Sequence, residues 1–137
     1  MLVDGPIDEA SVRAAVAHPS CGAVLVFVGV SREDRPAGHG GPVRRLFYEA
    51  YAPMAEAEIT RILDEARATW AGARIAVVHR VGEVPIGEAS VVIAVATPHR
   101  DDAYAASRFV IDTLKRRVPI WKQEGFDDGT RWKANEG

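Results

Sequence analysis

The chain has 137 residues, of which 47% are apolar and 26% are charged, and its formal net charge is −2. This length and composition predict one soluble globular domain over residues 1–137 that is large enough to bury a core. The small net charge does not indicate binding to nucleic acid or to an anionic membrane. No apolar run approaches the roughly 20 residues of a membrane span.

Cysteine and histidine usage excludes several kinds of chemistry. Cys21 is the only cysteine, so no internal disulfide or cysteine-based zinc cluster can form, and a reducing cytoplasm is the expected compartment. The amino end shows neither the basic segment nor the apolar run of a signal peptide. The four histidines are scattered and lack metal-binding spacing, so we expect no metal and no resident cofactor; they are His18, His39, His79 and His99.

The first half of the chain alternates regular elements with one long loop. Residues 8–17 predict a short helix, and residues 21–30 form a nearly continuous run of β-formers, typical of a strand covered on both faces. Residues 31–42 contain three glycines and two prolines and predict a loop. Strand signals resume at 43–51.

The second half predicts two helices and two strands. A helix follows Pro53, which suits a first helical turn, and its apolar residues keep helical spacing. Residues 74–81 and 89–97 predict strands, and 82–87 has turn chemistry. The last helix is expected over 101–117. The resulting order, α-β-β-α-β-β-α with short connections, favours an α+β domain with a mainly antiparallel sheet and helices packed on one side.

The segment around Pro119 contains two lysines that could line one pocket. Proline has no N–H and clashes with the preceding turn, so the last helix must stop near Arg117. Lys115 then lies on the last helical turn and Lys122 on a segment that turns away. Such a break can bring both ammonium groups around one pocket, with Trp121 as a wall. The alternative is a solvated basic helix end.

Other basic residues stand at the ends of predicted elements. Arg32 follows a strand, and His99 with Arg100 opens the last helix, whose backbone N–H groups attract anions. A surface arginine and a polar capping region are the alternatives at these two places. His79 and Arg80 are neighbours within a strand, so at most one of them faces any given pocket. The collection suits an anionic, phosphorylated small molecule.

Six groups of residues recur together in one protein family, in this order and spacing. They are Gly29–Arg32, Leu46–Tyr51 with Met54–Ala55, His79–Glu83 with Gly87–Glu88, His99–Arg100 with Ala103–Tyr104, Asp112–Lys115, and Pro119–Glu124. On these motifs the chain resembles the large, catalytic subunit of molybdopterin synthase, from about Gly22 to Trp132.

The resemblance implies an α/β hammerhead fold and a homodimer. It also implies a heterotetramer, in which each end of the dimer binds a small ubiquitin-like sulfur-carrier subunit with a C-terminal Gly-Gly thiocarboxylate. A sulfurtransferase normally needs a nucleophilic thiolate, and Cys21 opens an apolar strand, where an inert thiol is expected. Sulfur brought by a carrier agrees with that expectation.

The resemblance further implies the reaction. Two dithiolene sulfurs are added to cyclic pyranopterin monophosphate, its cyclic phosphate opens, and molybdopterin forms. By position, Lys115 and Lys122 match the catalytic residues. The substrate-binding residues would be Arg32, His99, Arg100, Lys115, Lys122, Gln123 and Glu124. Which lysine is the base, the acyl trap or the anion stabiliser stays open.

Two other functions fit the same basic residues. A non-catalytic scaffold would bind the tail of a ubiquitin-like protein without turnover. An unrelated phosphate-ester hydrolase would act without any carrier protein.

Overall fold

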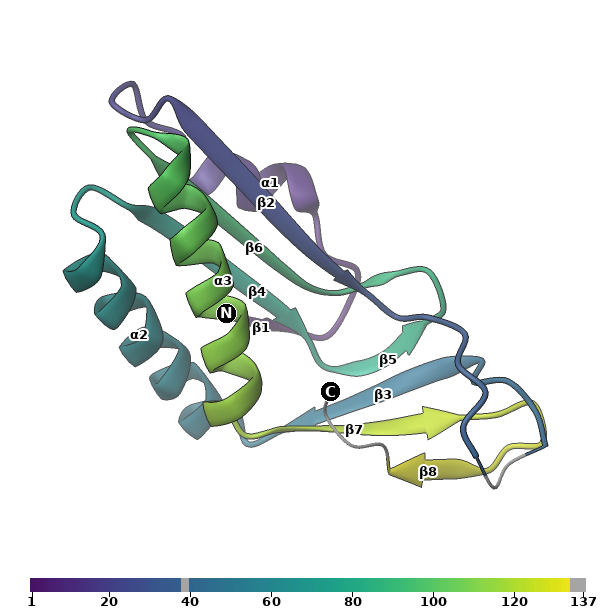
Figure 1. Cartoon of the computed structure of the whole chain (residues 1–137). Coiled ribbons are helices and arrows are strands. Elements are labelled where there is room, and N and C mark those ends of the chain that lie inside the picture. Colours follow the sequence, from purple (N-terminus) through teal and green to yellow (C-terminus); the bar gives the residue numbers. More distant parts are fainter. Residues whose placement is uncertain (38–39, 134–137) are drawn as a thin grey trace.

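The computed structural model describes residues 1–37 and 40–133, so His39 lies outside the described residues. Within these ranges the chain forms three helices and eight strands (Figure 1). In chain order they are β1 (Leu2–Val3), α1 (Glu9–Ala15), β2 (Ala23–Val30), β3 (Arg45–Ala50), α2 (Ala52–Thr69), β4 (Arg74–Arg80), β5 (Gly82–Pro85), β6 (Ala89–Thr97), α3 (Arg100–Arg117), β7 (Ile120–Gly125) and β8 (Arg131–Lys133).

The first sheet has the strand order β1-β4-β6-β2 and carries the main core. Its three long strands pair antiparallel, and the two-residue β1 pairs parallel with β4. Helices α2 and α3 lie side by side over one face (Figure 1). Ile75, Val77 and Ile93 of the sheet are buried there with Ile62 of α2 and Val110 of α3.

Helix α1 covers the opposite face of this sheet. Val12 and Val16 pack with Val92, Ala94 and Ala96 of β6, which alternate with the residues that face α2 and α3. Strand β6 is apolar on both faces, so both need a cover. The predicted α+β class is confirmed. The expected packing on one side holds for α2 and α3, and α1 is the exception.

The second sheet, β5-β3-β7-β8, is antiparallel and was only partly predicted. Strand β5 occupies most of the segment expected to be a turn. Its residues Gly82 and Pro85 pair with Tyr48 and Arg45 at the two ends of a four-residue ladder. Glycine and proline are turn signals in the sequence, whereas a short strand at the edge of a sheet tolerates both of them.

Helix α3 ends at Arg117, as Pro119 predicts. The N–H of Val118 closes the last turn by donating to the carbonyl of Leu114 at 3.0 Å. The Arg117 guanidinium then ties α3 to α2, because its Nε donates to Glu58 at 2.9 Å and its Nη1 to Glu65 at 2.9 Å. These hydrogen bonds lower the pKa of both carboxyl groups. No helix in the described part of the chain has the length and apolar character to cross a bilayer.

Candidate functional site

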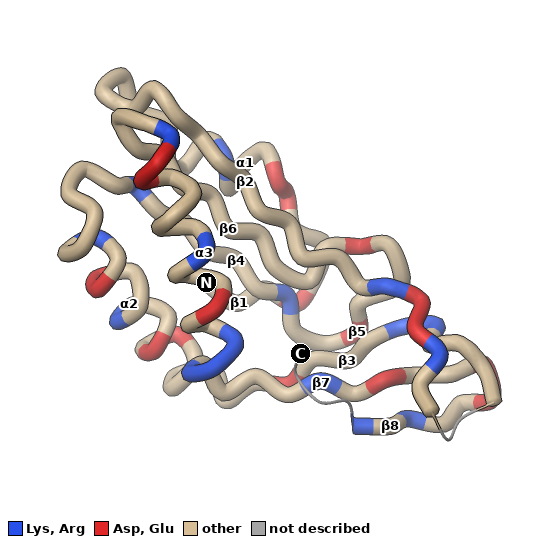
Figure 2. Tube along the Cα trace, viewed as in Figure 1, with Lys and Arg blue, Asp and Glu red and all other residues tan. Residues whose placement is uncertain are grey.

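A cavity of about 270 Å³ lies where the C-terminal part of α3, the end of β2 and the second sheet meet. Figure 2 shows basic segments at the end of α3, after β2 and within β7, around this junction. The charged and hydroxyl-bearing side chains that line the cavity are Ser31, Arg32, Asp34, Tyr48, Ser90, Lys115, Lys122 and Glu124. Four of the seven residues expected to bind substrate are among them.

The structure brings Lys115 and Lys122 to this one cavity from two different layers. Lys115 stands on the last turn of α3, next to the buried Leu114 that fixes the helix against the first sheet. Lys122 lies in β7 directly opposite Tyr48 of β3. The break at Pro119 therefore has the consequence expected for it: both lysine side chains line the same space.

Glu124 shares the cavity face of β7 with Lys122, because alternate residues of a strand point the same way. Its side chain is buried, and the residue is only 7% exposed. Burial raises the pKa of the Glu124 carboxyl, the Lys122 ammonium opposes this rise, and the nearby Asp34 carboxylate adds to it. A buried acid beside a cation can hold that cation in place.

Arg32 enters the cavity from the loop that follows β2. The preceding residue, Ser31, anchors this loop, because its hydroxyl donates to the carbonyl of Pro85 at 2.6 Å. The Arg32 side chain is largely exposed, and its Nε lies 3.0 Å from a carboxylate oxygen of Asp34. The guanidinium is thus held at the rim while most of its donors face solvent, where an anionic ligand can bind them.

Two expected site residues of β7 point away from the cavity. Gln123 and Trp121 alternate with Lys122 along the strand, so their side chains lie on the opposite face of the second sheet. Neither lines the cavity, and Trp121 is exposed. The wall expected from Trp121 is supplied by Tyr48 and Leu46 of β3.

His99 and Arg100 lie at the other end of α3. His99 is the N-cap residue and Arg100 the first residue of the helix. Fifteen residues separate Arg100 from Lys115, which at about 1.5 Å per helical residue is a distance of about 22 Å. Within one chain, then, the two basic clusters do not share a cavity.

Of the two neighbours His79 and Arg80, His79 lies at the site. The ring lies in a smaller recess of about 30 Å³ that adjoins the main cavity and shares Tyr48, Lys115 and Lys122 with it. Strand alternation was the available signal, since Ile75, Val77 and His79 all point to the core face.

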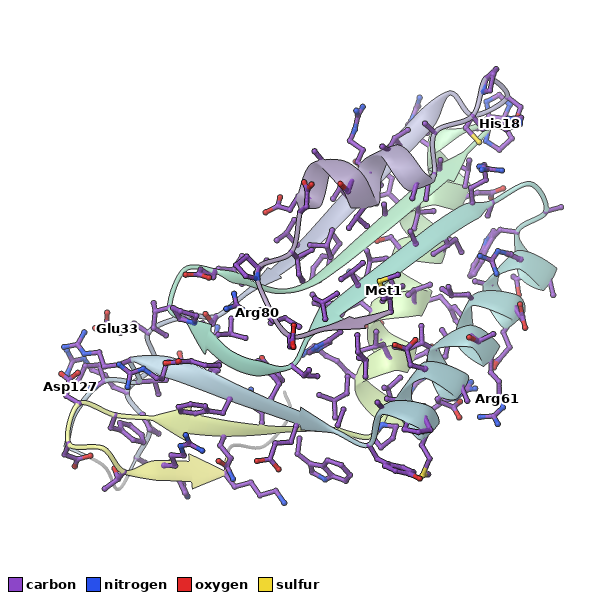
Figure 3. The ribbon with its side chains drawn as sticks, turned by 180° about the vertical axis from the view of Figure 1, so that it is seen from behind. Met1, His18, Glu33, Arg61, Arg80 and Asp127 are labelled. Atoms are coloured by element: carbon purple, nitrogen blue, oxygen red, sulfur yellow. The ribbon has the colours of Figure 1, made fainter. Side chains whose placement is uncertain are left out.

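Arg80, the neighbour of His79, points the other way. Its Nη1 donates to Glu88 at 2.7 Å, close to the turn between β5 and β6 (Figure 3). Arg80 is buried, and within the described residues its Nε has no hydrogen-bond partner. The side chains of His79 and Arg80 therefore point to opposite faces of β4, as expected for neighbours in a strand, and only His79 faces the recess.

The environment of His79 keeps its ring neutral. Its Nδ1 lies 2.8 Å from the carbonyl oxygen of Arg80, and Tyr48 meets the ring edge-on at a centroid distance of 5.1 Å. Burial lowers the pKa of His79 to about 4, and the positive charge of Lys115 contributes to the lowering, while the hydrogen bond to Arg80 opposes it. At neutral pH the imidazole is uncharged.

An α+β fold with two lysines and an arginine around one cavity has the charge to accommodate a small anionic ligand. The chain belongs to the MoaE protein family, whose model matches residues 2–117. It is 45% identical over 130 residues to the molybdopterin synthase catalytic subunit of Homo sapiens, covering 95% of this chain and 66% of the human protein.

Bacterial relatives match over more of their length. Molybdopterin synthase catalytic subunit 1 of Mycobacterium tuberculosis is 45% identical over 131 residues, which is 96% of this chain and 87% of that protein. Among solved structures, molybdopterin synthase from Staphylococcus aureus superposes with a TM-score of 0.89 at 40% identity, covering 97% of this chain and 94% of that chain. The family and its fold are those the sequence motifs predicted.

Proposed function

We propose that this chain is the catalytic subunit of a molybdopterin synthase and converts cyclic pyranopterin monophosphate to molybdopterin by adding two dithiolene sulfurs. The observation that carries the proposal is the convergence of Lys115, Lys122 and Arg32 on one cavity from three separate elements. The cavity is of a size to hold much of a small fused-ring ligand. Its cations suit the phosphate of that substrate.

A small ubiquitin-like sulfur-carrier subunit with a C-terminal Gly-Gly thiocarboxylate supplies the sulfur. The position of the single thiol supports this part of the proposal. Cys21 precedes β2, whose opposite end, at Gly29 and Val30, lines the cavity. Eight strand residues of about 3.3 Å each place the thiol about 26 Å from that end. A sulfur atom needed in the cavity then has to arrive on a partner.

The cavity residues divide the chemistry between binding and proton transfer. Arg32 holds the phosphate through its exposed donors. One of Lys115 and Lys122 takes a proton during thiocarboxylate attack or traps the acyl group of the spent carrier, and the other stabilises the anion that develops as the cyclic phosphate opens. The charge of Lys122 acts on Glu124, which lies on the same face of β7. Gln123 has no contact with this cavity in the free subunit.

A homodimer is needed if His99 and Arg100 also bind substrate. The distance of about 22 Å along α3 keeps them out of the cavity of their own chain. A second copy that places the start of its α3 beside the first copy's cavity would supply both residues. We therefore propose a dimer with shared sites, which forms a heterotetramer with two carrier subunits. Its compartment would be the cytoplasm, where Cys21 stays a free thiol.

Product formation tests the proposal directly. Purified protein is incubated with cyclic pyranopterin monophosphate and a thiocarboxylated carrier, and molybdopterin is measured after oxidation to a fluorescent derivative. We expect product only when the carrier has its thiocarboxylate. Binding of the carrier without product would favour the scaffold, and opening of the cyclic phosphate with no carrier present would favour the hydrolase.

A further inference from the structure

The recess beside the main cavity has the size and the lining of a water site. Its volume of about 30 Å³ exceeds the roughly 10–15 Å³ that one water needs and is far below the size of the proposed substrate. A buried water also needs two to four polar partners. His79, Ser90, Lys115 and Lys122 all line the recess and offer them.

The tautomer of His79 decides what it presents to this recess. A backbone carbonyl can only accept a hydrogen bond, so the nitrogen 2.8 Å from the oxygen of Arg80 must be a donating Nδ1–H. A neutral ring then has a lone pair on Nε2. Within the described residues Nε2 has no protein partner, although His79 is only 5% exposed. Among the described residues the one buried side-chain atom without a hydrogen-bond partner is Arg80 Nε, so Nε2 of His79 is not sealed from solvent. It can accept a hydrogen bond from a water in the recess that the ring lines.

Ser90 and the lysines complete the set of partners. The Ser90 hydroxyl donates to the carbonyl of Gly29 at 3.3 Å, which leaves its oxygen free to accept from a water. Lys115 and Lys122 contribute donors from the side of the recess that they share with the main cavity. A water in this place would donate to Nε2 and lie next to the reacting groups.

The proposed reaction requires such a water when the lysine acts as a base and does not trap the acyl group. When the thiocarboxylate sulfur bonds to a substrate carbon, the carbonyl carbon of the carrier stays attached to that sulfur as a thioester. To release the carrier, the oxygen of a water bonds to the carbonyl carbon and the C–S bond breaks, with its electron pair left on sulfur. One water proton passes to the sulfur or to solvent, and the other is lost to solvent from the new carboxylic acid.

We propose that His79 is a positioning residue, which orients the water that cleaves this thioester through the lone pair of Nε2. The inference rests on the function proposed above and adds a residue and a step to it. The low basicity of the ring fits an orienting role: it stays an acceptor at neutral pH and does not hold the proton.

Two substitutions separate this role from a structural one. In His79→Gln the side-chain amide oxygen can take the place of Nε2 and keep an acceptor in the recess. In His79→Asn the amide nitrogen can take the place of Nδ1 and keep the hydrogen bond to the carbonyl of Arg80. A purely structural role predicts that the asparagine variant is the better enzyme, and a water-orienting role predicts that the glutamine variant is. Thr113→Val is a matched control, because Thr113 is a buried polar residue of α3 outside the recess.

The measurement is a single turnover with thiocarboxylated carrier in ¹⁸O-labelled water, quenched in acid and analysed by mass spectrometry of the carrier. We expect the carrier–pterin thioester to form at a similar rate in all variants. Its decay, with ¹⁸O entering the carrier carboxylate, should slow by about tenfold or more in His79→Asn and much less in His79→Gln. The control should behave as wild type.

The outcomes keep the two proposals apart. Equal thioester decay in His79→Asn and wild type, or slower decay in His79→Gln than in His79→Asn, would overturn the role of His79 and leave the proposed function standing. A wild-type protein that forms neither thioester nor sulfurated product would overturn the proposed function, and the role of His79 with it. Thermal melting of each variant shows that the compared proteins are folded.

Discussion

Tyr48 in β3 and Lys122 in β7 are direct partners across the antiparallel pairing of the second sheet. Tyr48 also meets the ring of His79, a residue of the first sheet, at 5.1 Å. One aromatic side chain therefore joins the lysine of one sheet to the histidine of the other. The position of Lys122 depends on strand pairing, and that of Lys115 on helix packing, so the site exists only when both sheets are assembled.

Removal of either lysine should abolish most of the turnover. We expect Lys115→Ala and Lys122→Ala each to lower the rate by at least about 100-fold, a typical loss for a positioned acid–base group. Lys122→Arg should not restore it, because a guanidinium keeps its proton. The assay is molybdopterin formation with a saturating thiocarboxylated carrier. Arg116→Ala, next to Lys115 on the same helix, is the control and should stay active, since Arg116 does not line the cavity. Full activity of Lys122→Arg would show that position 122 needs only a positive charge, and would contradict a role of Lys122 as base or acyl trap.

Mixed dimers test whether the two ends of α3 meet across a subunit interface. We expect Arg100→Ala to weaken substrate binding by about tenfold, as the loss of one charge-assisted contact implies. A dimer with one Lys115→Ala subunit and one Arg100→Ala subunit, purified through two different tags, has one site with both changes and one with neither. It should therefore show about half of the wild-type turnover. If Arg100 served the site of its own chain, neither site of the mixed dimer would be intact, and turnover at subsaturating substrate would fall well below half of the wild-type value.

Substitution of the thiol should have little effect. Cys21 is half-buried before β2, and its Sγ lies 4.0 Å from the hydroxyl of Ser20. We expect Cys21→Ser to transfer sulfur from the thiocarboxylated carrier at nearly the wild-type rate, because the thiol is remote from Lys115 and Lys122. Loss of transfer in a variant that melts like wild type would contradict delivery by a carrier.

Burial of His79 should make stability depend on pH. Its pKa falls from 6.5 to about 4 on folding. Between these values the unfolded chain binds a proton and the folded chain does not, so this contribution to stability is fully present above pH 6.5 and is lost as the pH falls toward 4. On that basis the free energy of unfolding should drop by about 2 kcal/mol between pH 7 and pH 5. His79→Gln should lack this part of the slope in urea unfolding curves, and an equal slope in both proteins would refute it.

Local signals in the sequence predicted the first sheet and its helices well. Strand β6 and helix α2 have long apolar patterns, and Pro119 ends α3 wherever the rest of the chain lies. The second sheet was harder, because β7 reads Ile-Trp-Lys-Gln-Glu-Gly and β8 only Arg-Trp-Lys. Such short, polar strands form because a neighbour supplies hydrogen bonds, and pairing between distant segments has no local signature.

The candidate site shows the same division. The lysine pair could be predicted because the break of one helix determines it. The separation of Arg100 from Lys115 could be known only once α3 was seen to be one continuous helix. The outward direction of Gln123 could be known only once β7 was seen to be a strand. The role proposed for His79 depends on a hydrogen bond to a backbone carbonyl and on a recess lined by residues of five elements, which no linear pattern contains.

The length of the connection between Lys115 and Lys122 determines which residues of β7 face the cavity. The connection consists of two helical residues, Val118, Pro119 and the first two residues of β7, which pairs in register with β3. Deleting or inserting one residue there would leave the strand pairing in place but reverse the face on which each side chain of β7 lies. Trp121 or Gln123 would then enter the cavity in place of Lys122. Functional variants are therefore expected to keep the seven-residue interval between the two lysines.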